Sequence, residues 1–161
     1  MNVMTRPEPA REPGPVHSAA RSAPSKAALR LGYGGLLPFV LGAMLVWLVR
    51  ADAHPYAVQA LSAYAAVIVS FLGGVHWGLA LMQPSPPLPR LVWAVVPSLL
   101  AWPALLMPAQ SALVIFGVLL LACYLVDRRV YPEAGLAAWL TLRFRLTAVA
   151  SLSCFIGAGG A

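Results

Sequence analysis

Five long apolar stretches run through this sequence, and they limit the possible folds more than any other feature. They cover about residues 31–49, 56–82, 91–107, 111–126 and 137–157. A helix needs about 20 apolar residues to cross the hydrocarbon core of a bilayer. Only 10% of the 161 residues are charged, against about a quarter in soluble domains, so the chain lacks the polar shell of a water-soluble fold. We therefore expect an integral membrane protein.

The five spans are expected to be helices rather than strands. An open sheet edge would leave backbone N–H and C=O groups unsatisfied in lipid, and barrel strands alternate apolar and polar residues, which these stretches do not. Pro38, Pro97 and Pro103 lie inside the first and third spans and predict kinks there. The expected fold class is all-α, a polytopic bundle of about five transmembrane helices in a single domain over residues 29–161.

The positive charges predict the orientation. Residues 1–28 should form a disordered, basic, proline-rich tail, because they contain no apolar run that could offset the entropy of ordering them. Lys and Arg concentrate on the cytoplasmic side of membrane proteins. With five crossings and the N-terminus inside, ten of the eleven Lys and Arg residues lie inside and only Arg50 lies outside. We expect a cytoplasmic N-terminus and an external C-terminus, and leave open whether the fifth span crosses fully.

His76 is the most informative single residue. An ionisable side chain within a span is costly to bury and marks a candidate functional site. His76 precedes the inner end of the second span by six residues, about 9 Å at 1.5 Å per residue. The alternative is a neutral imidazole that hydrogen-bonds a neighbouring helix as part of the packing. The other candidate polar residues of the inner half are Tyr33, Trp77, Asp127, Arg128, Arg143 and Arg145.

Two arginines open the fifth span. Arg143 and Arg145 flank Phe144 and should point to opposite faces of the helix. By default, both should extend to the inner interface. The sharper alternative is that one of them pairs with Asp127 and locks the fourth and fifth spans together. The same span carries a polar stripe at helical spacing that should face the bundle, formed by Arg143, Thr147, Ser151 and Cys154.

Small residues recur every four positions along the second span. The stripe consists of Ser62, Ala66, Ser70, Gly74 and Gly78. Small residues let membrane helices approach closely, so we expect this stripe, with Gly73 beside it, to be the central packing surface. A homodimer seam is the alternative.

The two cysteines are not expected to form a disulfide. Cys123 should lie near the inner membrane surface and Cys154 near the outer one, too far apart to bond.

Motifs of several function classes are missing from the sequence. It holds no phosphate loop, nucleophile elbow or metalloprotease motif, and Asp127 is the only acid near a span. Two isolated cysteines cannot form a structural zinc site. Nucleic-acid binding is not expected, because the cations lie in the tail and loops rather than on one face. Haem bound through His76 would need a second ligand from another subunit, since His17 and His54 lie elsewhere.

Four segments resemble a family of uncharacterised inner-membrane proteins. They are Leu31–Phe39 (LGYGGLLPF), Phe71–Gly78 (FLGGVHWG), Tyr124–Arg129 (YLVDRR) and Leu142–Thr147 (LRFRLT). The family is a domain of unknown function that includes mitochondrial transmembrane protein 69 and proteobacterial relatives. The resemblance implies a multi-span membrane protein without an established activity. The family-type positions are Gly73, Gly74, His76, Trp77, Gly78, Asp127 and Arg128.

The functional expectation is correspondingly limited. We expect a non-enzymatic accessory or assembly component of a larger membrane complex, with the bilayer and either a membrane protein or a second copy as partners. The first alternative is a small transporter or a lipid- or quinone-binding protein with a site near His76, and the second is a haem-bearing redox subunit. No cofactor is predicted. The Ala-, Arg- and Pro-rich sequence favours a bacterial plasma membrane over a mitochondrial inner membrane.

Overall fold

The computed structural model describes residues 23–161, and every regular element in this part of the chain is helical. The all-α class is therefore confirmed. The elements are α1 (Lys26–Gly34), α2 (Leu37–Leu48), α3 (His54–Leu81), α4 (Leu88–Ala104), α5 (Ala109–Glu133), the short 3₁₀ helix η1 (Ala137–Trp139) and α6 (Leu140–Gly159).

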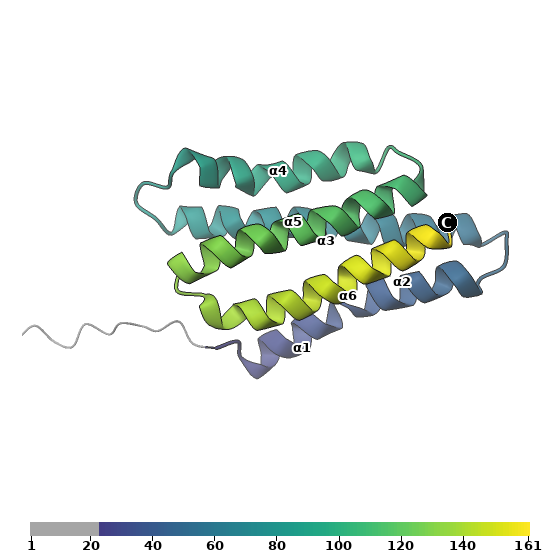
Figure 1. Ribbon diagram of the computed structural model, residues 1–161, viewed down its shortest axis with the longest axis horizontal. Coiled ribbons are helices and arrows are strands. Elements are labelled where there is room, and N and C mark those ends of the chain that lie inside the picture. The colour runs from purple at the N-terminus through teal and green to yellow at the C-terminus, as the bar shows by residue number, and fades with distance from the viewer. Residues whose placement is uncertain (1–22) are drawn as a thin grey trace, which may run out of the picture.

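Four stretches of the described chain are long and apolar enough to cross a membrane. They are Lys26–Leu48, His54–Leu81, Ala109–Glu133 and Ala137–Gly159. The fifth, α4, has 17 residues, which corresponds to about 25 Å at 1.5 Å per residue. The segments run up and down between two ends, and the C-terminus lies at the end opposite the start of α1 (Figure 1). This arrangement agrees with five traversals.

The first span begins earlier than the sequence indicated. Ser25 caps α1, its hydroxyl accepting a hydrogen bond from the Ala28 N–H at 3.1 Å, so residues 26–28, assigned above to the tail, are helical. The rest of the expected tail, residues 1–22, lies outside the described residues.

A break interrupts the first span between α1 and α2, close to the kink expected at Pro38. Proline has no N–H to donate to the carbonyl of residue 34, so the regular ladder cannot continue there. The Tyr64 hydroxyl of α3 donates to the Gly35 carbonyl at 2.8 Å and ties the break to the neighbouring helix. Pro97 and Pro103 lie inside α4, as expected.

The turn between α5 and α6 has a simple local cause. Gly135 follows the end of α5 with φ of 72°, the left-handed conformation that glycine adopts without strain. The Leu136 N–H donates to the Tyr131 carbonyl at 2.7 Å, and the Gly135 N–H donates to the Pro132 carbonyl at 3.0 Å. This is the Schellman arrangement that ends many helices. It turns the chain back so that α6 packs antiparallel to α5.

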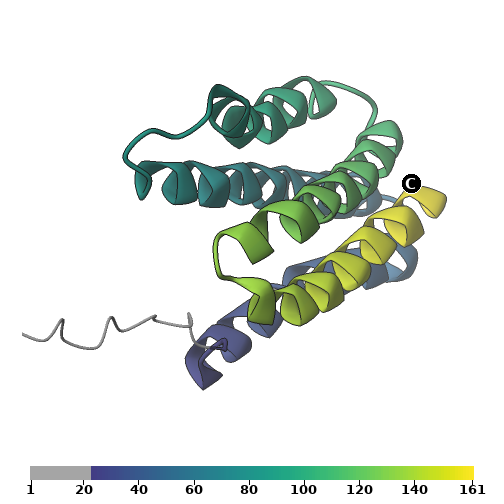
Figure 2. The same cartoon turned by 60° about the vertical axis from the view of Figure 1, so that its left-hand side comes forward.

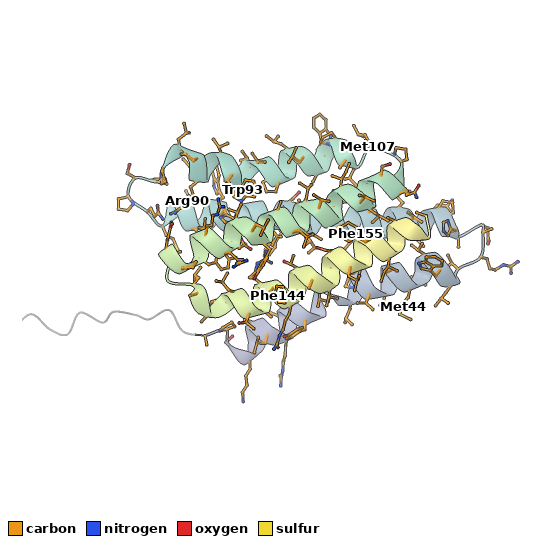
Figure 3. The ribbon with its side chains drawn as sticks, in the orientation of Figure 1. Met44, Arg90, Trp93, Met107, Phe144 and Phe155 are labelled. Carbon is orange, nitrogen blue, oxygen red and sulfur yellow. The ribbon has the colours of Figure 1, made fainter. Side chains whose placement is uncertain are left out.

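Helix α3 is central, and α4 packs along its outer side, away from α2 and α6 (Figures 1 and 2). The largest buried side chains include Phe39, Leu61, Leu113, Phe116 and Leu120. Glycines allow two of the close contacts. A Cβ on Gly157 of α6 would lie 2.5 Å from Leu61, and a Cβ on Gly117 of α5 would lie 2.6 Å from the Phe155 ring, which Figure 3 labels between these helices.

The small-residue stripe of α3 is only partly a packing surface, which corrects the expectation. Ser62 and Ala66 are buried, but Gly74 and Gly78 are exposed, and a Cβ on either would meet no atom within 4 Å. The reason is geometric: four-residue steps advance about 40° around a helix with 3.6 residues per turn, so the stripe drifts out of the core. The close approach is at Gly73, whose Cβ would lie 2.5 Å from the Ala94 carbonyl oxygen of α4.

Candidate functional site

Three ionisable side chains from three helices meet in the interior. His76 comes from α3, Asp127 from α5 and Arg143 from α6. His76 Nε2 lies 2.8 Å from Asp127 Oδ1, while Arg143 Nε donates to Asp127 Oδ2 at 2.8 Å. The His76 and Asp127 side chains are each 2% exposed and that of Arg143 is 13% exposed. The structure therefore brings together the predicted His76 and the predicted Asp127–Arg143 pair in one buried cluster.

The cluster has a definite hydrogen-bond polarity. An ionised carboxylate only accepts, so the hydrogen in the His76–Asp127 bond belongs to Nε2. The other ring nitrogen, Nδ1, is buried and has no hydrogen-bond partner. Asp127 and Arg143 carry opposite charges, which compensate each other within the ion pair.

Arg143 and Arg145 point in different directions, and one of them pairs with Asp127, as the alternative prediction stated. Arg143 turns inward to Asp127, so the default expectation that both extend to the interface is wrong for Arg143. Arg145 is exposed, and its Nη1 donates to the Tyr33 hydroxyl of α1 at 3.2 Å. Phe144, between them, is exposed, and its ring lies 5.7 Å from the ring of Tyr124 of α5. The inward face of α6 continues with Thr147, Ser151 and Cys154, all buried, which confirms the predicted polar stripe.

The remaining sequence candidates lie outside the cluster. Trp77 is exposed and lines a groove between α3 and α4, together with Gly74. Arg128 is also exposed. Cys123 on α5 and Cys154 on α6 are both free and buried.

An ion pair that the sequence does not reveal lies near the same end of the bundle. Arg90, labelled in Figure 3, donates from Nη2 to Glu133 Oε2 at 3.0 Å and links the start of α4 to the end of α5. Nothing in the local sequence relates these residues, which are 43 positions apart. Tyr131 was also missed, although its ring lies 6.3 Å from that of His76.

A cavity of about 280 Å³ adjoins the cluster on the Arg143 side. Its polar lining residues are Arg143 and Thr147. The others are apolar or glycine: Leu31, Gly32, Gly35, Leu36, Phe39, Ile68, Phe71, Leu72, Leu120, Leu146 and Ala150. The cavity thus extends from the α1–α2 break across α3 and α5 to α6. The sequence indicates a site near His76, but the residue that lines the cavity is its neighbour in the cluster, Arg143.

The cavity opens toward the surface that lipid covers in a membrane. Two of its lining residues, Leu31 and Phe71, are 78% and 64% exposed. The deeper lining residues Phe39, Leu72 and Leu120 are buried.

Two observations concern metal and haem ligation at the cluster. Among residues 23–161, no three His, Cys, Asp or Glu side chains are grouped so that they could hold a metal ion. His76 Nε2 is engaged by Asp127, so axial ligation of haem through that nitrogen would break a buried hydrogen bond.

Fold and sequence together define a polytopic α-helical membrane protein with a buried charged cluster. The chain belongs to the family described as "Protein of unknown function (DUF3429)", whose model matches residues 24–159. This confirms the resemblance found in the sequence.

Two relatives carry the name transmembrane protein 69. The Xenopus tropicalis protein is 45% identical over 106 residues, which are 62% of this chain and 41% of the relative. The Mus musculus protein is 33% identical over 84 residues, 50% of this chain and 34% of the relative. The chain spans less than half the length of these relatives. No solved structure matches it significantly.

Proposed function

We propose that this chain is an intramembrane binding protein for a lipid-soluble small molecule, held in the cavity beside Arg143. The observation that carries the proposal is the pair of polar residues, Arg143 and Thr147, in an otherwise apolar cavity wall. Ligand sites typically combine an apolar enclosure with a few polar groups that orient the ligand. Transport of the bound molecule is one use of such a site, and storage or presentation to another membrane protein is another.

The size of the cavity supports a ring or an acyl segment as occupant. An engineered apolar cavity of about 150 Å³ takes up benzene. The cavity beside Arg143 measures about 280 Å³, close to the lower limit of about 300 Å³ for ligand pockets. The bound part of the ligand is therefore a head group or a short stretch of chain, and a longer tail would extend past Leu31 and Phe71 into the bilayer.

Filling the cavity tests the proposal. Ala150 is buried and lines the cavity, whereas Ala148 on the same helix is exposed. Ala150→Leu should reduce the amount of a bound lipid-soluble compound, and Ala148→Leu should leave it unchanged. The measurement is mass spectrometry of compounds extracted from protein purified in mild detergent, normalised to protein. Equal recovery of the same bulk phospholipids from wild type and both variants would refute a specific site.

We further propose the bacterial plasma membrane as the location, with the mitochondrial inner membrane as the alternative. The support is the Ala-, Arg- and Pro-rich sequence together with the family of transmembrane proteins to which the chain belongs. Fractionation of the source cells on a density gradient tests the location. Recovery with outer-membrane markers would contradict it.

A second candidate is the accessory or assembly role in a larger membrane complex. The observation that favours it is the outward turn of the α3 stripe, which leaves Gly74 and Gly78 exposed beside a groove lined also by Ser70 and Trp77. The expected occupant is a helix of another membrane protein, because exposed glycines permit close helix approach.

Native gel electrophoresis of solubilised membranes tests this second role. Gly74→Leu combined with Gly78→Leu should abolish a larger complex. Val67→Leu, at an exposed position of the same helix, should preserve it. Migration of the wild-type protein as a lone monomer would refute the role.

A further inference from the structure

Two buried donor groups at the cavity lack hydrogen-bond partners. The Thr147 hydroxyl is one of them, on a side chain that is 3% exposed. The other is Arg143 Nη2, which lies 2.6 Å from Asp127 Oδ2 in the ion pair but makes no hydrogen bond of acceptable geometry. Buried polar groups are nearly always satisfied, so each such exception calls for a ligand, a water or another explanation. Both residues line the same cavity, one helical turn apart on α6.

The unsatisfied groups specify what a ligand must supply. A guanidinium carries five N–H groups and accepts nothing. Asp127 and the Tyr131 hydroxyl engage part of the Arg143 guanidinium, and its remaining hydrogens need a further acceptor. A hydroxyl can donate to the same acceptor. An oxygen with two lone pairs, placed between Arg143 and Thr147, would satisfy both side chains. The rest of the cavity wall is apolar, so the remainder of the ligand must be apolar.

The charge of the cluster limits the kind of oxygen. Asp127 already pairs with Arg143, so the guanidinium charge is compensated before any ligand binds. A carboxylate or phosphate ligand would bring an uncompensated negative charge into a low-dielectric interior, which is strongly unfavourable. A carbonyl oxygen accepts the same hydrogen bonds without bringing a charge.

We propose that the cavity binds a neutral, lipid-soluble carbonyl compound, whose carbonyl oxygen accepts hydrogen bonds from Arg143 and Thr147. This inference rests on the proposed function and names its ligand class. Two membrane sources share the chemistry: a quinone ring and the ester carbonyl of an acyl lipid. Both carry an apolar tail that fits the exit past Leu31 and Phe71.

Four probes with the same decyl chain separate the possibilities. They are a decyl-substituted benzoquinone, decyl acetate, decanoate and decylbenzene. Binding to the full-length protein in nanodiscs is measured at neutral pH by isothermal titration calorimetry. The quinone or the ester should bind at least about tenfold tighter than decylbenzene, as two hydrogen bonds of about 1 kcal/mol each would produce. The tighter of the two carbonyl probes identifies the source.

A matched pair of variants tests the hydrogen bond itself. Thr147→Val removes the hydroxyl at nearly constant shape and should weaken binding of the carbonyl probe about three- to tenfold, with no effect on decylbenzene. Thr141→Val, at an exposed position of the same helix, is the control. With a ¹³C-labelled carbonyl, the infrared stretching band should shift to lower frequency on binding to wild type, and less in Thr147→Val.

The outcomes distinguish this inference from the proposed function. If decylbenzene binds as tightly as the carbonyl probes, or decanoate binds tightest, the carbonyl class is wrong while the cavity remains a binding site. If none of the four probes binds and the filled variant Ala150→Leu behaves like wild type, both proposals fail.

Discussion

Asp127→Asn is the substitution that tests the buried cluster most sharply. It keeps the shape of the side chain but removes its charge, so Arg143 loses its counter-ion. Removing one partner of a buried ion pair costs about 3–5 kcal/mol, because the other charge stays buried and unpaired. Arg143 is 13% exposed and lies near the start of α6, so it can turn partly toward the interface. We therefore expect a loss at the lower end, about 3 kcal/mol.

The double variant separates charge burial from general damage. Arg143→Gln alone should cost about 2–3 kcal/mol, because it leaves the Asp127 carboxylate with His76 as its remaining partner. Asp127→Asn combined with Arg143→Gln leaves no unpaired charge. It should lose at least about 1.5 kcal/mol less than the sum of the single variants.

Reversible unfolding in mixed detergent micelles, with increasing SDS, measures these free energies. Arg145→Gln is the control, because this side chain is exposed and solvent-screened and should contribute little to stability. Additive losses in the double variant would show that Asp127 and Arg143 do not interact directly and would refute the cluster.

Three further predictions concern packing and topology. Gly73→Ala should destabilise the protein by about 1–3 kcal/mol in the same SDS assay, because the added Cβ would meet the α4 backbone. Gly74→Ala should be neutral, because its Cβ would meet no atom within 4 Å. Equal effects of the two substitutions would contradict the placement of α3 against α4. Cys123 and Cys154 should resist maleimide in mild detergent and react in SDS, because both are buried; labelling without denaturant would contradict this. A periplasmic alkaline phosphatase reporter fused after Ala161 should be active, and cytoplasmic activity of a fused fluorescent protein would contradict five crossings.

The helices could be predicted because hydrophobic length alone determines most of the architecture. Apolar runs of about 20 residues leave little choice but transmembrane helices. Less accurate were the ends of the spans. Residues 26–28 are Lys-Ala-Ala and contain no bulky apolar side chain, so they resemble the Ala-rich tail, yet the Ser25 cap starts a helix there. The break between α1 and α2 depends on Pro38 and on a tertiary contact from Tyr64, and only Pro38 is visible in the sequence.

The candidate site could be predicted in part. The positions of His76, Asp127 and Arg143 along their spans predicted that all three lie at a similar depth in the membrane. The four-residue spacing of Arg143 and Thr147 indicated that Arg143 is the arginine that faces inward. The cavity could not be predicted, because its volume depends on how far the helices separate around the α1–α2 break. The prediction that Gly74 is a packing residue was wrong. It assumed that residues four apart stay on one face, although each four-residue step rotates about 40° around a helix with 3.6 residues per turn.

The most direct test of the account is a high-resolution density map of the protein isolated from its native membrane in nanodiscs, without added ligand. We expect elongated density in the cavity, with an oxygen at hydrogen-bond distance, about 2.7–3.2 Å, from both Arg143 and Thr147 Oγ1. A cavity closed by its own side chains, or one that holds only water, would contradict it.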